Sequence, residues 1–248
     1  MDTLFISDIH LTEQRPDKIQ LFTSFLHSPA ARESAALYIL GDLFEYFWLG
    51  NDDRTPPVKK IITELADFTR SGSRVFFIRG NRELMLDKGF EALTGCTVLD
   101  DMTVIELDGK KVLISHGDRF CIKDVKYQIY RRFMEREFTR KLFLSFPYGL
   151  RTSLVNGLRP FMRRSVMNKP PDIIDVDQTA VASTMRQHGV SELIHGHTHR
   201  PGIHQFTLDG QAASRIVLGD WYEHDSVLVC NDGNYKLMRV QEYLDTKR

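Results

Sequence analysis

The sequence predicts an α/β protein built on two sheets, with a helical insertion between its two halves. Short apolar runs alternate with longer amphipathic segments in the first half, as strands do when crossover helices join them. A basic, aromatic-rich stretch follows, and then short alternating runs return, several of them separated by Asp-Gly or Gly-Asn turns. A chain of 248 residues with 42% hydrophobic and 27% charged residues can bury a sizeable core, which excludes a disordered or linker-like protein.

Each element follows from its local pattern. Compact aliphatic or aromatic runs in the first half predict buried strands at Thr3–Ser7, Ala36–Leu40, Arg74–Ile78 and Lys111–Ser115. Amphipathic segments predict helices at Asp17–Leu26 and, opened by a Pro-Pro pair, at Val58–Thr69. The tail is expected to form antiparallel strands that complete a second sheet, at Glu192–His195, Ile203–Leu208, Arg215–Leu218, Ser226–Cys230 and Tyr235–Val240.

The insertion from Arg119 to Lys169 concentrates basic charge. It holds 13 Lys or Arg and 3 Asp or Glu, a net of +10 in a chain whose formal net charge is 0. Aromatic residues are interleaved at spacings typical of amphipathic helices, which are broken near Pro147 and Pro160. Such a surface suits anionic lipid headgroups with acyl chains, and equally an RNA backbone. A solvated helical face over core aromatics is the plainer alternative.

Cysteine usage and the first residues bear on the compartment. Cys96, Cys121 and Cys230 are widely spaced and include no CxxC pair, which argues against a disulfide framework or a thiolate zinc site and favours a reducing cytosol. The first residues lack the basic and apolar regions of a signal peptide. No stretch approaches the roughly 18 apolar residues needed to span a bilayer, so membrane association is expected to be peripheral.

Candidate metal ligands follow five of the predicted strands. Alternate residues of an extended segment point to the same side, so an i, i+2 pair can hold one ion. Each motif alone is common in turns and helix caps. Their shared placement is informative because the carboxyl ends of strands form the edge at which open α/β sheets bind ligands. The seven candidates are Asp8, His10, Asp42, Asn81, His116, His197 and His199.

The chemistry of these ligands predicts two divalent ions. Carboxylate, amide and imidazole groups without thiolate suit Mn²⁺, Fe²⁺ or Zn²⁺ better than Ca²⁺. The two oxygens of the Asp42 carboxylate can bridge the pair. We assign Asp8, His10, Asp42 and His199 to one ion, and Asp42, Asn81, His116 and His197 to the other.

The ordered motifs DxH, GD, GN, H and GHxH resemble those of the calcineurin-like metallophosphoesterases, and the match spans essentially the whole chain. The resemblance implies an α/β class fold, a four-layer α/β/β/α sandwich with a helical cap insertion. It implies a single domain over residues 1–248, with residues 120–170 as a lipid-binding cap. It also implies two divalent metal ions, with Mn²⁺ as the expected metal.

Within that superfamily, four motifs resemble those of the UDP-2,3-diacylglucosamine diphosphatases of lipid A biosynthesis. They are GNR in place of the commoner GNH, HGDxxC, IHGHTHRP and LGDW. The resemblance implies hydrolysis of a lipid-linked sugar nucleotide to UMP and 2,3-diacylglucosamine 1-phosphate, through attack of dimetal-activated water on the α-phosphorus. It implies a peripheral protein on the anionic, cytoplasmic face of the bacterial inner membrane, with no nucleic-acid partner. The implied catalytic residues are Asp42, Asn81, Arg82 and His116, and the implied substrate contacts are Asn81, Arg82, Asp124, Tyr127, Arg159, Lys169 and His197.

Arg82 supports a pyrophosphate substrate independently. A histidine there could donate a proton to a poor leaving group, whereas arginine stays protonated and can only stabilise negative charge. Cleavage of a pyrophosphate expels a phosphate monoester, which needs no proton. A surface salt bridge is the plainer role for Arg82.

Two other functions stay open. A nucleotide or nucleic-acid phosphodiesterase could use the same dimetal site, although a histidine would be more natural there than Arg82. An inactive binding scaffold could keep the metallophosphoesterase fold, although it would not need all seven ligands.

Overall fold

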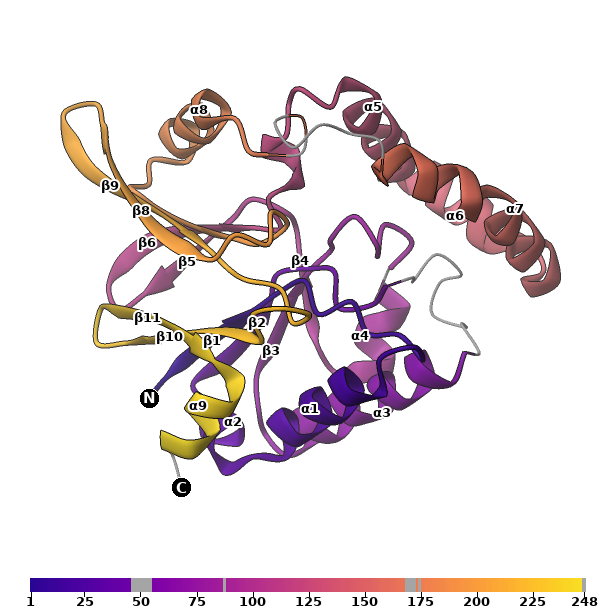
Figure 1. Ribbon diagram of the computed structural model, residues 1–248, viewed down its shortest axis with the longest axis horizontal. Coiled ribbons are helices and arrows are strands. Elements are labelled where there is room, and N and C mark those ends of the chain that lie inside the picture. Colours follow the sequence, from indigo (N-terminus) through magenta and orange to yellow (C-terminus); the bar gives the residue numbers. More distant parts are fainter. Residues whose placement is uncertain (46–54, 87, 168–172, 174, 247–248) are drawn as a thin grey trace.

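A computed structural model shows two sheets packed face to face, with helices outside both (Figure 1). The structure describes residues 1–45, 55–86, 88–167, 173 and 175–246, with residues 159–167 described by their backbone alone. This arrangement is the α/β/β/α sandwich that the sequence predicts.

The first sheet combines parallel strands from the start of the chain with a hairpin from its end. β1 (Thr3–Ile6), β2 (Ala36–Ile39), β3 (Val75–Ile78) and β4 (Thr97–Leu99) run parallel to one another. β10 (Ser226–Asn231) pairs antiparallel with β1, and β11 (Asn234–Arg239) pairs antiparallel with β10. The strand order is therefore β11-β10-β1-β2-β3-β4.

The second sheet has the order β5-β6-β7-β9-β8. The strands β6 (Lys110–Ser115), β7 (Glu192–His195) and β9 (Gln211–Val217) are parallel. The two edge strands, β5 (Thr103–Leu107) and β8 (Gly202–Leu208), are antiparallel to their neighbours. The carboxyl ends of β6 and β7 thus lie at one edge of this sheet.

Helices complete the outer layers. On the first sheet they are α1 (Pro16–His27), α2 (Pro29–Arg32), α3 (Pro56–Arg70), α4 (Lys88–Thr94) and α9 (Val240–Thr246). On the second sheet lies α8 (Gln178–His188), which begins where the Asp177 side chain accepts hydrogen bonds from two backbone N–H groups and ends at Gly189 with φ 63°. Proline at the first turn favours the starts of α1 and α3.

The insertion forms a helical arm beside the sandwich. A short 3₁₀ turn, η1 (Asp118–Phe120), leads into α5 (Val125–Met134), α6 (Glu137–Ser145) and α7 (Tyr148–Met167). Figure 1 shows α6 and α7 extending away from the two sheets. No helix in the described ranges is both long enough and apolar enough to cross a bilayer.

Three buried apolar clusters separate the four layers. One lies between the first sheet and its helices and includes Phe25 and Leu65. The second lies between the sheets and includes Phe5 and Ile114. The third joins α8 to the outer face of the second sheet and includes Met185. Burial on both sides explains why the strands of the first half are continuous apolar runs.

The expectation for the tail was wrong in part. β8 and β9 complete the second sheet, but β10 and β11 extend the first one. β10 is buried on both faces, because Val227 belongs to the cluster under the helices and Leu228 to the cluster between the sheets. A strand of that kind fits the interior of a sheet, where β10 pairs with β1 on one side and β11 on the other.

Met185→Ala should show that α8 is an integral layer. Met185 is fully buried against the second sheet, so truncation should lower the free energy of unfolding by about 2–5 kcal/mol. Urea denaturation measures the change. Ser183→Ala is the matched control on the exposed side of the same helix and should stay within about 0.5 kcal/mol. Equal effects of the two substitutions would contradict this packing.

Candidate metal centre

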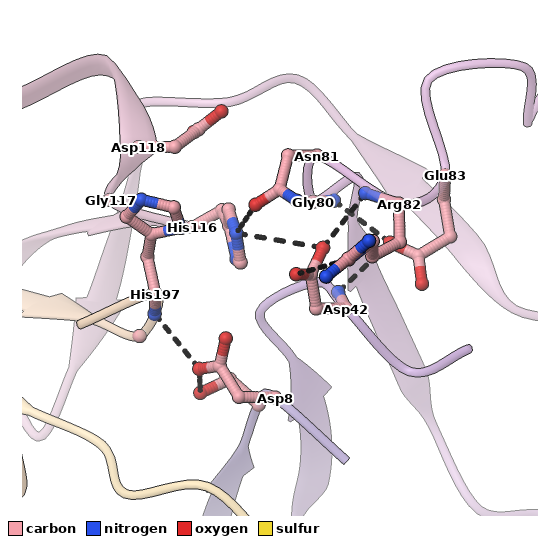
Figure 2. Close-up of polar contacts among 12 residues, drawn as sticks. Asp8, Asp42, Gly80, Asn81, Arg82, Glu83, His116, Gly117, Asp118 and His197 are labelled. Atoms are coloured by element: carbon pink, nitrogen blue, oxygen red, sulfur yellow. Dashed lines mark hydrogen bonds and ion pairs between the residues drawn. The ribbon is translucent and has the colours of Figure 1, made fainter. Parts of the chain in front are cut away.

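All seven predicted ligands lie in loops that follow strands at one edge of the sandwich. Asp8 and His10 follow β1, Asp42 follows β2, and Asn81 follows β3 in the first sheet. His116 follows β6, and His197 and His199 follow β7 in the second sheet. Figure 2 shows side chains from both sheets facing one another across this edge.

One group of ligand atoms belongs to Asp8, His10 and His199, and these atoms lie within 4.8 Å of one another. His10 Nε2 is 3.4 Å from His199 Nε2, which is itself 3.3 Å from Asp8 Oδ1. Asp42 Oδ2 is 3.8 Å from His10 Nε2. The four side chains assigned to the first ion therefore converge.

A second group belongs to Asp8, Asp42 and His116, also within 4.8 Å. His116 Nε2 is 3.6 Å from Asp42 Oδ1 and 3.1 Å from Asn81 Oδ1. The ring of His197 packs edge-on against that of His116, with centroids 5.1 Å apart. Asp8 contributes to both groups, and Asp42 lies near ligands of both.

The backbone at these positions is strained. Asp8, His10, Asp42, His197 and His199 all have positive φ, between 51° and 72°. In the described part of the chain only ten residues other than glycine have positive φ, and half of them are these candidate ligands. Left-handed backbone is unfavourable for L-residues and persists where surrounding contacts impose it, which is common at functional sites.

Motif glycines let the ligand loops approach each other. A Cβ at Gly80 would lie 2.2 Å from Asp42 Oδ1, and one at Gly196 would lie 2.4 Å from Asp8 Oδ2. Gly41 combines φ 86° with a Cβ position only 2.6 Å from the Gly80 backbone. Side chains at these positions would displace the carboxylates.

A hydrogen bond orients the His116 ring, and a carboxylate lies beside the outer nitrogen of His10 and of His199. His116 Nδ1 donates to the Leu40 carbonyl at 2.8 Å, which leaves the Nε2 lone pair facing Asn81 and Asp42. His10 Nδ1 lies 3.1 Å from Glu45 Oε2, and His199 Nδ1 lies 3.6 Å from Asp220 Oδ2. Each Nε2 therefore points into the site while the opposite nitrogen faces an oxygen.

Glu83 fixes the relative position of two ligand loops. Its Oε2 accepts hydrogen bonds from the backbone N–H groups of Asp42 at 2.9 Å and Gly80 at 3.1 Å, and its Oε1 accepts one from Phe44 at 2.9 Å (Figure 2). Burial, and then the charge of Asp42, raise the pKa of Glu83 to about 8. The carboxyl group thus spans the loops after β2 and β3.

Glu45, Glu83 and Asp220 were missed as site residues by the sequence analysis. All three lie in or next to motifs named above, since Glu45 follows Asp42 of the GD motif by three residues, Glu83 directly follows GNR, and Asp220 is the aspartate of LGDW. Their partners are backbone groups or rings on other loops, which a single motif does not indicate.

The site fits divalent cations. Asp8 Oδ1 is buried and accepts no hydrogen bond from the described residues. Burial would raise the pKa of Asp8, but the neighbouring histidines outweigh it and hold the pKa well below the usual value. Burial, and then His116, keep the pKa of His197 well below its ordinary value. An ionised carboxylate and a neutral imidazole are the forms that bind metal ions.

Arg82 lies at the rim of the site. Its backbone N–H donates to Asp42 Oδ1 at 2.9 Å, its Nε is 3.9 Å from Asp42 Oδ2, and its Nη2 is 3.8 Å from Glu45 Oε1. The side chain is 24% exposed.

The predicted substrate residues of the insertion are described in part. Asp124 caps α5 by accepting a hydrogen bond from the backbone N–H of Tyr127, and the Tyr127 hydroxyl donates to Asp118, two residues after His116. Arg159 lies on α7, with only its backbone described. Lys169 lies outside the described residues.

Comparison with known proteins gives a consistent family. The calcineurin-like phosphoesterase family model matches residues 1–201. A protein named UDP-2,3-diacylglucosamine hydrolase from Aeromonas salmonicida is 47% identical over 96% of this chain and 92% of its own. A protein of the same name from Vibrio parahaemolyticus is 45% identical over 96% of this chain and 97% of its own. Another, from Pseudomonas syringae, is 42% identical over 94% of each chain.

A solved archaeal phosphodiesterase covers 96% of this chain and 99% of its own, at 13% identity and a TM-score of 0.48, a likeness too low to support a functional conclusion. The family model and the similarity along nearly the whole chain agree with the strand-end ligands described above, and confirm the resemblance on which the sequence interpretation relies. This chain belongs to the calcineurin-like phosphoesterase family.

Proposed function

We propose that this protein hydrolyses the pyrophosphate bond of UDP-2,3-diacylglucosamine, giving UMP and 2,3-diacylglucosamine 1-phosphate. The observation that carries the proposal is the convergence of seven candidate ligand side chains at one edge of the sandwich, in a chain that is 42–47% identical to hydrolases named for this substrate. The reaction is a phosphoryl transfer to water.

Two divalent cations, proposed to be Mn²⁺, would supply Lewis-acid stabilisation of the phosphate and activation of water. Asp8, His10, Asp42 and His199 would hold one. Asp42, Asn81, His116 and His197 would hold the other, and the position of Asp8 between both groups makes its carboxylate a second candidate bridge. Absence of cysteine among these groups favours a borderline metal over a thiolate-bound one.

Arg82, Asn81 and His197 would bind the phosphate. The Arg82 guanidinium stays protonated at all relevant pH and offers a fork of donors that matches phosphate oxygens. Its Nε lies 3.9 Å from Asp42 Oδ2, which supports a role for that charge beside the proposed metals. With attack at the α-phosphorus, the leaving group is 2,3-diacylglucosamine 1-phosphate, a phosphate monoester that requires no proton, so stabilisation of charge is the chemistry that this site needs.

The helical arm would bind the lipid part of the substrate and the anionic membrane surface. α5 exposes Val125, Ile129 and Phe133 at i, i+4 and i+8, so they share one face of that helix. α6 exposes Phe138 and Leu142, of which Phe138 is 75% exposed. Exposed apolar side chains amid a net charge of +10 are characteristic of surfaces that meet acyl chains and acidic headgroups.

Two of the proposed substrate contacts lie at the base of this arm, where Asp124 caps α5 and Tyr127 lies in its first turn. Both would contact the diacylated glucosamine, and Arg159 and Lys169 would complete the cap contacts. In this proposal the protein acts peripherally at the cytoplasmic face of the bacterial inner membrane and binds no nucleic acid.

Asp42→Asn should impair the enzyme more than His10→Asn or His197→Asn, because only Asp42 is assigned to both ions. We expect kcat to fall by at least about 100-fold. UMP release in the presence of Mn²⁺ measures activity, and metal analysis should find fewer bound ions per chain. A fully active Asp42→Asn protein with two bound ions would overturn the assignment.

Arg82→Ala should lower kcat by about 100- to 1000-fold, since a charged donor aimed at the phosphate is lost. Arg82→Lys should recover only part of the activity because a lysine cannot make the forked contact. The pH profile of both variants should keep the wild-type shape, because arginine donates no proton. Wild-type activity in Arg82→Lys would rule out a bidentate contact.

The diacylated substrate should be hydrolysed with a kcat/KM at least about tenfold above that of deacylated UDP-glucosamine, because burial of acyl methylenes on the arm contributes to binding. Product analysis on the two sugar nucleotides measures this ratio. In parallel, Phe138→Asp should weaken binding to vesicles that contain acidic phospholipid, and rising salt should weaken wild-type binding. Equal hydrolysis of the two substrates, or preferential binding to RNA, would favour the phosphodiesterase alternative.

A further inference from the structure

A buried cluster of charged side chains joins the first helix of the arm to the loop that carries His116. Its centre is Arg131 on α5, whose side chain is only 2% exposed. Arg131 faces Asp101, in the turn between β4 and β5, and Asp118, in η1. These two carboxylates are 6% and 0% exposed, so the cluster belongs to the interior.

The Arg131 guanidinium is bound on all sides. Nη2 donates to Asp101 Oδ2 at 3.0 Å, Nε donates to Glu135 Oε1 at 2.8 Å, and Nη1 forms an ion pair with Asp118 Oδ1. Arg119 adds a second contact to the same Asp101 oxygen at 3.0 Å. A fork of donors with this many fixed partners has one orientation.

Asp101 passes this constraint to the metal-ligand loop. Its Oδ1 accepts hydrogen bonds from the His116 backbone N–H at 3.1 Å and from Ser115 Oγ at 2.7 Å. Ser115 Oγ in turn accepts from the Gly117 backbone N–H at 3.1 Å. One carboxylate therefore binds the arm through one oxygen and the backbone of a candidate metal ligand through the other.

The same helix carries the proposed substrate contacts. Tyr127 donates to Asp118, the residue that pairs with Arg131, and its backbone N–H donates to the Asp124 side chain. Asp118 also follows His116 by two residues. Groups proposed to contact substrate and a group proposed to hold metal are thus attached to a single buried cluster.

Stability alone does not account for such a cluster. Removing several charges from water is costly, and buried ion pairs are often no more stabilising than apolar side chains of the same volume. What the arrangement provides is a defined geometry between α5 and the His116 loop, because the two oxygens of Asp101 bind one side each.

We propose that Arg131 and Asp101 are positioning residues, which fix the His116 loop relative to the substrate-binding base of the arm. Neither residue touches the reacting atoms. They act through the His116 backbone, so that the second metal site is formed in register with Asp124 and Tyr127. This inference rests on the proposed function for its catalytic consequence, but its structural part can be measured without substrate.

The test compares Arg131→Met and Arg131→Lys with wild type and with Arg186→Met. Arg186 provides a matched control. Like Arg131, it is a helix residue that pairs with a carboxylate outside its helix, but it lies on α8, and its ion pair with Asp209 is exposed. Three quantities are measured: hydrogen exchange of the 115–117 amides in metal-free protein, Mn²⁺ affinity by titration calorimetry, and kcat and KM for UDP-2,3-diacylglucosamine.

Arg131→Met should speed exchange at 115–117 by about tenfold or more, because the partner of Asp101 is lost. Mn²⁺ affinity and kcat should each fall by about 10- to 100-fold, as for other residues that orient metal ligands, with a smaller change in KM. Arg131→Lys should be intermediate because it keeps the charge without the fork. Arg186→Met should match wild type in all three measurements.

A lower melting temperature in Arg131→Met, with wild-type exchange at 115–117, Mn²⁺ affinity and kcat, would overturn the proposal and leave only a structural role. If Arg131→Met does not fold, Asp101→Asn decides in the same way, since it preserves shape while removing the ion pairs. If the wild-type protein does not hydrolyse the lipid substrate, the proposed function fails, while exchange and Mn²⁺ binding still decide whether Arg131 positions His116.

Discussion

The close approach of the loops at the carboxyl ends of the strands is the constraint on which the candidate metal centre depends. Gly80 and Gly196 lie where any side chain would meet the carboxylates of Asp42 and Asp8. The loops are also joined through their backbones, since the N–H of Asp8 bonds the carbonyl of Gly41 and that of Gly196 bonds the carbonyl of His116. Five of the ligands have left-handed backbone conformations at this contact, and the paired, largely buried strands beneath can hold such strain.

Such packing brings together charges that repel one another. Asp8, Asp42 and Glu83 are all buried within a few residues of the same edge, and the charge of Asp42 is one reason that the pKa of Glu83 is raised. Imidazole rings and backbone N–H groups compensate in part, as does the Arg82 side chain near Asp42. Divalent cations between the carboxylates would supply the remaining positive charge, which is why the fold and the metal chemistry are best understood together.

Sequence patterns predicted the strands that carry the ligands because those strands are buried on both faces and end at ligand-bearing turns. The four strands predicted in the first half end within one residue of the observed ones. The tail was harder, since the apolar run of β10 does not reveal which sheet the strand joins. That depends on pairing with β1, more than two hundred residues earlier. Asp101 carried no local signal at all, because its partners His116 and Arg131 lie 15 and 30 residues further along the chain and become its neighbours only in the folded structure.

The attachment of the arm explains why its charged cluster lies where it does. Among the side chains of α5 only Arg131 is buried, and α6 buries none. The apolar side chains Val125, Ile129 and Phe133 of α5 are exposed rather than packed against the core, so hydrophobic burial contributes little where α5 meets the sandwich. Polar contacts to Arg131, Tyr127 and Gln128 take over that role. Because such contacts are directional while apolar contacts are not, the arm is attached in a defined orientation toward His116.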